Sequence, residues 1–290
     1  MNARIDQHPQ DVSPRVIAVA SGKGGVGKTF FSVHLAARAA DAGKRVLLMD
    51  ADLGLANVDV MLGISSATSI HDVVEGKTSL SETLVDSGYG FDVLPGGSGF
   101  HTLTKLSPRQ QQIVLDELGA TGVNYDMVII DTAAGIGENV LYFVSASESA
   151  LIVLTPDPTS LTDAYALIKV LSRQRDMHRF MVVINQADEI DAQITFRRLL
   201  SVADRYLDVH MDYMGNLPAS RDVRQAIQTQ RLLGRDGDFP RAMQQILDAV
   251  LRQPRDASRG SGLQFFWEHS LNEALAAEPP LAVGAQAGNI

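Results

Sequence analysis

The chain has 290 residues, of which 45% are hydrophobic and 20% are charged, and its net charge is −9 at pH 7. This length supports one sizeable domain with a single core, while the acidic balance argues against general nucleic-acid binding. The sequence contains no cysteine, which excludes disulfides, thiolate metal sites and cysteine nucleophiles and is consistent with a reducing cytoplasm.

The first part of the chain, residues 1–14, is expected to be a flexible segment. It is polar and mixed in charge, and it lacks the basic and apolar regions of a signal peptide. No apolar run in the sequence approaches the ~20 residues that span a bilayer. We therefore expect a soluble or at most peripheral protein.

A glycine-rich run at residues 21–29, SGKGGVGKT, is the most informative motif. It contains G-x-x-x-x-G-K-T, follows an apolar stretch at 16–20 and opens an amphipathic stretch at 30–42, which is the setting of a phosphate-binding loop. Backbone N–H groups and a helix N-terminus bind phosphate in such loops, while the lysine reaches the β/γ-phosphates and the threonine holds Mg²⁺. The predicted nucleotide-binding residues here are Gly24, Gly25, Val26, Gly27, Lys28, Thr29 and Phe30.

Two further features of this loop bear on its function. The run also satisfies G-x-G-x-x-G, with Asp50 about 20 residues further on, as in a dinucleotide-binding fold. That fingerprint is weak and does not explain the adjacent Lys28 and Thr29, so we favour the phosphate loop. Lys23 is a second lysine that a plain phosphate loop does not need, and it is a candidate for contact with a nucleotide held by a facing subunit.

Short β-branched apolar runs alternate with helical segments along the chain. Strands are predicted at 16–20, 45–49, 127–130, 150–154 and 180–184, and helices at 30–42, 107–118, 138–147, 160–175 and 192–206. The alternation predicts an α/β fold, a mainly parallel twisted sheet with helices on both faces. Polar residues follow four of the strands and should meet at the ligand-binding edge of the sheet: Asp50, Asp131, Thr155 and Asn185.

Acidic residues at this edge predict a magnesium site. Asp50 and Asp52 leave their strand on the same side, and a strand-terminal aspartate such as Asp131 is the Walker B arrangement. The predicted metal-binding residues are Thr29, Asp50, Asp52 and Asp131. Asn57 and Asp59 follow, and two interpretations stay open for them: a brace for this segment, or helix capping. His34 is expected to be a packed or exposed helical residue rather than a base.

The pattern K-G-G-V-G-K-T is the deviant Walker A motif, and with it the chain resembles the MinD/ParA family of dimerising ATPases. The resemblance implies a P-loop NTPase fold of the SIMIBI class, ATP or ADP with Mg²⁺ as ligands, and slow hydrolysis in an ATP-bound homodimer. It implies catalytic roles for Lys23 across the dimer, Lys28 on the phosphates and Asp52 on the attacking water. Asn185 and Pro218 are implied to contact the adenine, and a turn at a strand end is the alternative for both.

Four longer segments, at 50–63, 93–99, 131–137 and 155–170, resemble the FlhG subfamily, also called FleN or YlxH. The resemblance runs from about Arg15 to Val250. It implies control of flagellar number, placement and gene expression, with the GTPase FlhF, the activator FleQ/FlrA and the switch proteins FliM and FliN as expected partners. The GTPase-stimulating element of the subfamily, D-Q-A-x-x-L-R, is matched only at Asp6 and Gln7, and Pro9 falls inside it.

The expected domain organisation is an ATPase domain at 15–251, a linker at 252–262, an amphipathic helix at 263–277 and a disordered tail at 278–290. An aromatic-rich amphipathic helix can lie in a bilayer interface, although Glu268 and Glu273 weaken its attraction to anionic lipid. Packing on the domain or on a partner is the alternative. With the resemblance, we expect peripheral contact with the inner face of the cell membrane, at the cell pole.

Other functions stay open beside this one. A MinD-like regulator of the division site is one alternative, since the phosphate loop marks the whole superfamily. A ParA-type DNA or cargo partitioning ATPase would need a basic surface on the late helices, for which the candidates are Arg197, Arg198, Arg221 and Arg224. An iron–sulfur reductase relative is disfavoured because there is no cysteine to hold a cluster.

Overall fold

The computed structural model describes residues 14–52, 57–69, 72–73, 75–96, 117, 121 and 124–255. Within them, one sheet of eight strands has the order β3-β4-β2-β5-β1-β6-β7-β8. The strands are β1 (Arg15–Ser21), β2 (Val46–Ala51), β3 (Val85–Asp86), β4 (Asp92–Leu94), β5 (Met127–Ala134), β6 (Ser149–Leu154), β7 (Arg179–Asn185) and β8 (His210–Leu217). Neighbouring strands pair in parallel except β3 with β4.

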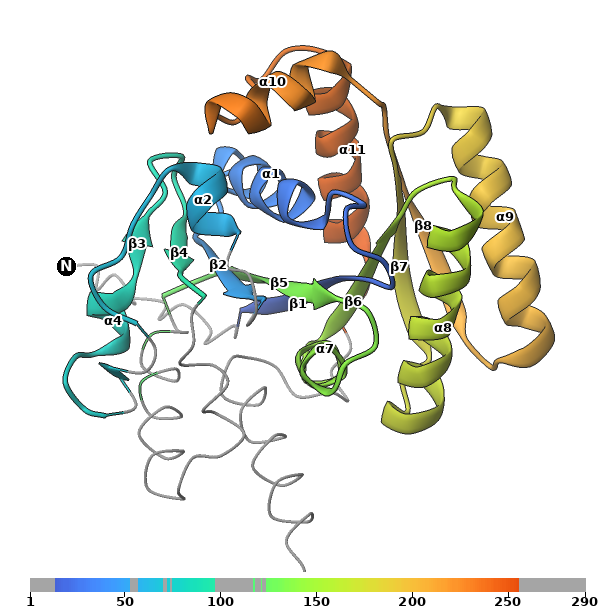
Figure 1. The fold of residues 1–290 in the computed structure, drawn as a ribbon, viewed down its shortest axis with the longest axis horizontal. Coiled ribbons are helices and arrows are strands. Elements are labelled where there is room, and N and C mark those ends of the chain that lie inside the picture. The colour runs from blue at the N-terminus through green and yellow to red at the C-terminus, as the bar shows by residue number, and fades with distance from the viewer. Residues whose placement is uncertain are drawn as a thin grey trace, which may run out of the picture.

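Helices cover both faces of this sheet (Figure 1). They are α1 (Lys28–Asp41), α2 (Val58–Leu62), α4 (Leu80–Thr83), α7 (Glu138–Ser145), α8 (Pro158–Arg175), α9 (Glu189–Tyr206), α10 (Arg221–Thr229) and α11 (Asp238–Arg252). The core on one face joins α7, α8 and α9 to the sheet, and the core on the other joins α1, α2, α10 and α11. The predicted α/β fold is therefore confirmed.

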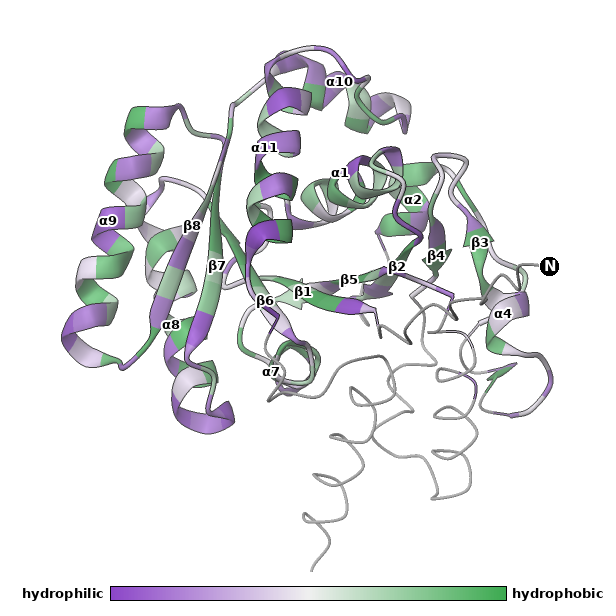
Figure 2. Ribbon diagram, turned by 180° about the vertical axis from the view of Figure 1, so that it is seen from behind, coloured by the Kyte–Doolittle hydropathy of each residue, from purple (hydrophilic) through white to green (hydrophobic). Residues whose placement is uncertain are grey.

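The burial of the strands explains why their sequences are apolar throughout. In β1, alternate side chains enter opposite cores, Val16 and Ala18 on one face and Ile17 and Val19 on the other. Figure 2 shows the same division at larger scale, with hydrophobic residues along the strands and hydrophilic residues on the outer turns of α9 and α11. No helix in the described part of the chain has the length and hydrophobicity that a bilayer span requires.

Each predicted strand is present and is longer than predicted, most clearly β5. β2 continues through Asp50 to Ala51, where it still pairs with β5, and β5 continues through Asp131 to Ala134, which pairs with Ser21 of β1. The helix predicted from residue 192 begins at Glu189, since the Asp188 side chain accepts a hydrogen bond from the backbone N–H of Asp191 (2.8 Å).

Other predicted segments fall largely or wholly outside the described residues. They are the N-terminal segment at 1–14, the helix at 107–118, most of the linker at 252–262, the amphipathic helix at 263–277 and the tail at 278–290. The predicted domain boundaries stay predictions, as does the comparison of Asp6 and Gln7 with the GTPase-stimulating element.

Candidate functional site

The phosphate loop connects the end of β1 to the start of α1. Gly25 and Gly27 have positive φ values of 78° and 89°, which residues with a Cβ rarely adopt, and α1 begins at the next residue, Lys28. A Cβ on Gly27 would also lie 2.5 Å from the Asn185 side-chain nitrogen. The chain thus places a tight glycine turn at the N-terminus of a helix, which is a binding site for anionic oxygens.

Gly22 opens the loop where the backbone lies against α8. A Cβ at this position would lie 2.1 Å from the carbonyl carbon of Asp163, which is far inside van der Waals contact with helix backbone. We expect Gly22→Ala to destabilise the protein by about 1–3 kcal/mol, because one of the two segments must shift. Urea denaturation measures this change.

Gly24→Ala is the matched control for that substitution. The two glycines lie in the same loop, but a Cβ on Gly24 would have no atom within 4 Å. The backbone of Gly24 is also outside the left-handed region, so alanine can adopt it. We expect its free energy of unfolding to stay within about 0.5 kcal/mol of the parent, as for ordinary surface substitutions. Equal stability of the two variants would show that the contact between the loop and α8 is not tight.

Lys28 and Asp131 form the centre of the site. The Lys28 Nζ lies 3.5 Å from the Asp131 Oδ1, and both side chains are buried. The Ser32 hydroxyl also donates to this Oδ1, at 2.9 Å. The other carboxylate oxygen, Oδ2, is buried and has no hydrogen-bond partner among the described residues. A buried acceptor without a partner is costly, so its position calls for a ligand.

Asp50 lies beside Asp131, directly across the parallel pair of β2 and β5. Burial, with a smaller contribution from the neighbouring Asp131 carboxylate, raises the pKa of Asp50 to about 6 against the backbone hydrogen bonds that lower it. Those bonds come from the backbone: Oδ1 accepts from Asp52, and Oδ2 accepts from Asn57 (2.9 Å) and Val58 (3.1 Å). Asp50 therefore holds the segment that carries Asp52.

These contacts bear on the two interpretations that the sequence leaves open for Asn57, a brace for the segment or a helix cap. Asn57 occupies the N-cap position of α2, as the capping interpretation expects, but its side chain makes no capping hydrogen bond there. The Asp50 carboxylate accepts from the first N–H groups of α2 in its place. Asp59 accepts from the next backbone N–H, that of Val60, as a residue of the first helical turn.

The oxygen atoms at this edge fit a hard divalent cation. Such ions take carboxylate, hydroxyl, phosphate and water oxygens. Asp131 offers its unpartnered Oδ2, Asp50 lies in register beside it, and the Thr29 hydroxyl makes no hydrogen bond within the described part of the chain. The described residues hold no group of three histidine or acidic side chains that would bind a metal unaided. A cation here would therefore share its ligands with phosphate and water.

Lys23 is held at the N-terminus of α8. Its Nζ lies 3.1 Å from the Asp157 Oδ1 and 2.5 Å from the Thr159 hydroxyl, and its side chain is 40% exposed. Hydrogen bonds from Thr155, Thr159, Ser160 and Lys23 hold the pKa of Asp157 well below its usual range. Within one subunit, Lys23 is thus anchored by its own chain, and its action across a dimer stays a prediction.

Asn185 and Pro218 lie at neighbouring strand ends. Asn185 pairs in register with Leu217, the residue before Pro218. The Asn185 side-chain amide donates to the Val26 carbonyl (2.7 Å) and accepts from the backbone N–H of Gln186, so it braces the phosphate loop. The structure therefore brings both predicted base-contacting residues next to the loop, and their contact with adenine stays a prediction.

Sequence reasoning missed two residues that this site uses. Asp157, the N-cap of α8, could have been predicted from the sequence, because an aspartate followed by proline at the first helical position marks a helix start. Ser32 carries no signal, since its contact with Asp131 joins residues that are 99 positions apart.

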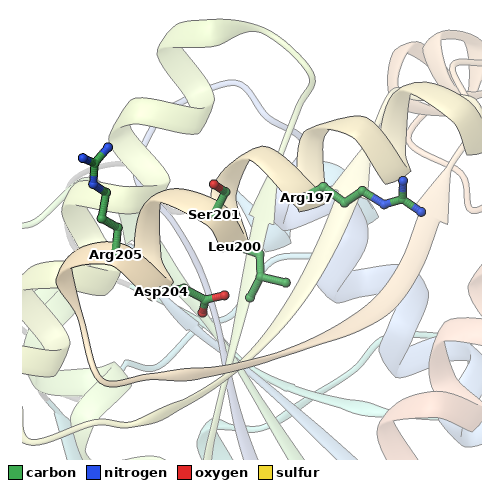
Figure 3. A pocket seen from close by; sticks show the side chains of 5 residues that line it. All are labelled: Arg197, Leu200, Ser201, Asp204 and Arg205. Atoms are coloured by element: carbon green, nitrogen blue, oxygen red, sulfur yellow. The ribbon is translucent and has the colours of Figure 1, made fainter.

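A separate hollow of about 450 Å³ lies on α9 (Figure 3). Leu200 and Asp204 point to one side of the helix, while Arg197 and Arg205 extend toward its two ends and Ser201 completes the lining. None of the residues predicted to bind nucleotide or metal or to act in catalysis lines this hollow. It belongs to the surface near the β8 edge of the sheet, away from the phosphate loop.

The comparisons with known proteins agree with this geometry. A family model described as an AAA domain matches residues 14–183. The antiactivator FleN of Pseudomonas aeruginosa is 43% identical over 260 residues, covering 88% of this chain and 92% of that protein. The chain belongs to the FleN/YlxH group of MinD/ParA-type ATPases. The predicted resemblance is thereby confirmed.

Two further relatives place this FleN/YlxH-group chain within the wider family. The flagellum site-determining protein YlxH of Helicobacter pylori is 35% identical, covering 76% of this chain and 74% of that one. Among solved structures, the MinC:MinD cell division complex of Aquifex aeolicus is 28% identical with a TM-score of 0.65, covering 83% of this chain and 98% of that one. As a member of the family, the chain is a nucleotide- and Mg²⁺-binding NTPase.

Proposed function

We propose that this protein is an ATP-dependent, dimerising regulatory ATPase that controls flagellar number, placement and gene expression. The antiactivator FleN and the flagellum site-determining protein YlxH each match more than two thirds of the chain, and both are more than 30% identical to it. The observation that carries the biochemical part is the buried, unpartnered Oδ2 of Asp131 beside the phosphate loop.

Each site residue then has a role in ATP hydrolysis. The loop N–H groups and Lys28 bind the phosphates, and Thr29, Asp50 and Asp131 hold Mg²⁺, which neutralises phosphate charge. Asp52 orients the attacking water. Lys23 of each subunit stabilises charge on the nucleotide of the other.

The Lys23 anchor is compatible with such a switch. Both side chains of its ion pair with Asp157 are about two-fifths exposed, and exposed ion pairs contribute little to stability. A triphosphate on a facing subunit presents several negative charges where Asp157 presents one. We infer that Lys23 leaves Asp157 when two ATP-bound subunits meet, so that dimerisation depends on the γ-phosphate.

Partners and location follow from the same proposal. We expect FlhF, FleQ/FlrA and FliM or FliN to bind the protein according to its nucleotide state, and residues 263–277 to mediate peripheral membrane contact at the cell pole. Partitioning of DNA is not supported, because Arg197 and Arg198 lie on α9 and Arg221 and Arg224 on α10, at opposite faces of the sheet. That arrangement separates the basic residues such a function would need.

Lys23→Ala tests the central step. We expect the variant to bind ADP and ATP as a monomer but to lose ATP-dependent dimerisation, measured by light scattering after size-exclusion chromatography. Lys44→Ala, an exposed lysine at the far end of α1, is the matched control and should dimerise like the parent. A Lys23→Ala protein that still dimerises in ATP would contradict the trans-acting lysine. Normal flagellar number after deletion of the gene would contradict the biological role.

A further inference from the structure

Ser32 connects the first helix to the carboxylate at the centre of the site. Its side chain is fully buried one turn into α1, and its Oγ lies 2.9 Å from the Asp131 Oδ1 and 3.1 Å from the Lys28 carbonyl oxygen. A hydroxyl carries one proton, and an ionised acceptor makes the stronger hydrogen bond. The proton therefore goes chiefly to Asp131.

The consequence is an oriented carboxylate. Among the described residues, Asp131 accepts only from Ser32 and Lys28, and both contacts are made by Oδ1. The second of these contacts is long, at 3.5 Å. Oδ2 is left buried and without a partner. The surrounding residues therefore bind Oδ1 and leave Oδ2 available for a ligand.

We propose that Ser32 is a positioning residue that holds Asp131 so that its Oδ2 faces the Mg²⁺ of the nucleotide complex. This inference rests on the proposed nucleotide function. When phosphates draw the flexible Lys28 ammonium toward them, Ser32 is the remaining described side chain that donates to Asp131. Carboxylates around metal ions are held by such outer hydrogen bonds, and losing one weakens metal affinity about 10–100-fold.

The chain offers a matched control for Ser32. Buried serines in helices often donate to the carbonyl four residues earlier, and this bond alone has no bearing on a metal. Ser147 makes it with Phe143 (2.7 Å) at the end of α7 and is equally buried. Ser32 makes the equivalent bond with Lys28 and, in addition, reaches Asp131. The comparison of the two serines isolates the second contact.

The test measures Mg²⁺ dependence in the full chain. A fluorescent ADP analogue is titrated into the parent, Ser32→Ala, Ser32→Thr and Ser147→Ala, at increasing Mg²⁺ and in EDTA. For Ser32→Ala we expect the Mg²⁺ concentration at half-maximal effect to rise at least tenfold, with affinity in EDTA within about twofold of the parent. Ser32→Thr retains the hydroxyl and should restore the Mg²⁺ requirement, and Ser147→Ala should not change it.

Two results would overturn the inference. One is a Ser32→Ala protein with the parent's Mg²⁺ requirement, and the other is an equal loss of affinity with Mg²⁺ and in EDTA, which a purely structural role would give. If Ser32→Ala does not fold by circular dichroism, Ser32→Cys, which is similar in size but a weak donor, must show the same rise. A parent protein that binds no nucleotide would overturn the proposed function. If the parent binds nucleotide in a Mg²⁺-dependent manner and the Ser32 variants do not behave as expected, only the inference about Ser32 is overturned.

Discussion

Asp52→Ala is expected to lower the rate of ATP hydrolysis by about 10²–10³-fold while leaving ATP binding and ATP-dependent dimerisation intact. A side chain that orients or activates the attacking water acts on the chemical step, and removing such a group typically costs 10²–10⁴-fold. Because the variant cannot complete hydrolysis, the ATP-bound dimer should accumulate.

The geometry supports a role for Asp52 that is separate from nucleotide binding. Its backbone N–H donates to the Asp50 Oδ1 at 3.0 Å, so the main chain of Asp52 is held at the end of β2. Truncation of the side chain leaves that bond in place. The phosphate loop and Asp131 are held by other contacts, which the substitution does not touch.

The measurement is phosphate release under saturating ATP, together with light scattering in ATP and ADP. Asp59→Ala is the control, since Asp59 follows Asp52 closely and, among the described residues, its Oδ1 accepts only a local bond from the backbone N–H of Val60 in the first turn of α2. Asp59→Ala should hydrolyse ATP within about twofold of the parent. Parent-like turnover by Asp52→Ala would remove its assigned role, and loss of the dimer would make it a binding residue.

The strands and the phosphate loop could be predicted because their physical signals are local. A strand buried on both faces must be apolar at nearly every position, and a turn through positive φ must use glycine, as at Gly25 and Gly27. The polar residues at the strand ends could be predicted to converge because parallel strands end at one edge. Asp50 and Asp131 do so in direct register.

The parts that escaped prediction depend on tertiary contacts. Among the described strands β8 lies at the edge and pairs only with β7, and an irregularity in its register interrupts the alternation of buried and exposed residues. The positions of Lys23 and Ser32 depend on Asp157 and Asp131, which lie more than 90 residues away in sequence. No local pattern encodes such a pair, and the sequence alone therefore predicts the loop but not what holds it.

Because of His34, we expect the free energy of unfolding to fall by about 3 kcal/mol at acid pH. The ring is buried between α1 and the segment after α10. Its Nδ1 lies 2.9 Å from the Phe30 carbonyl oxygen, and its Nε2 accepts from the backbone N–H of Leu233 (3.1 Å). The ring also lies against Phe30 and Phe239, with centroids 4.0 and 5.4 Å away. This arrangement satisfies a neutral imidazole and has no acceptor for a second proton.

The direction of the effect follows from the pKa. Burial lowers the pKa of His34 from 6.5 to about 4, with a smaller lowering by Arg38 and an opposing contribution from the Phe30 carbonyl. The unfolded chain therefore binds this proton more readily than the folded one. Stability is complete above pH 6.5 and falls as the pH drops toward 4, and the gap between the two pKa values corresponds to about 3 kcal/mol.

Asp50 titrates in the same pH range as His34, but its protonation has the opposite effect on folding stability. Its pKa is raised to about 6 in the folded protein, so the folded state gains from its protonation as the pH falls. The two effects partly cancel in the parent protein. Only the difference between the parent and a His34 variant isolates the imidazole, and His34→Gln serves because a glutamine oxygen can still accept from Leu233.

Urea denaturation without nucleotide, at pH 7.5 and at pH 4.5, gives this difference. At pH 7.5 we expect His34→Gln to be less stable than the parent by about 1 kcal/mol, the usual cost of a lost hydrogen bond. At pH 4.5 the order should reverse, because the parent then loses about 2–3 kcal/mol that the variant does not. His210→Gln, which changes an exposed imidazole, should follow the parent at both pH values. Parallel behaviour of parent and His34→Gln would mean that the buried ring accepts its second proton without penalty, which its contacts with Leu233 and Phe30 argue against.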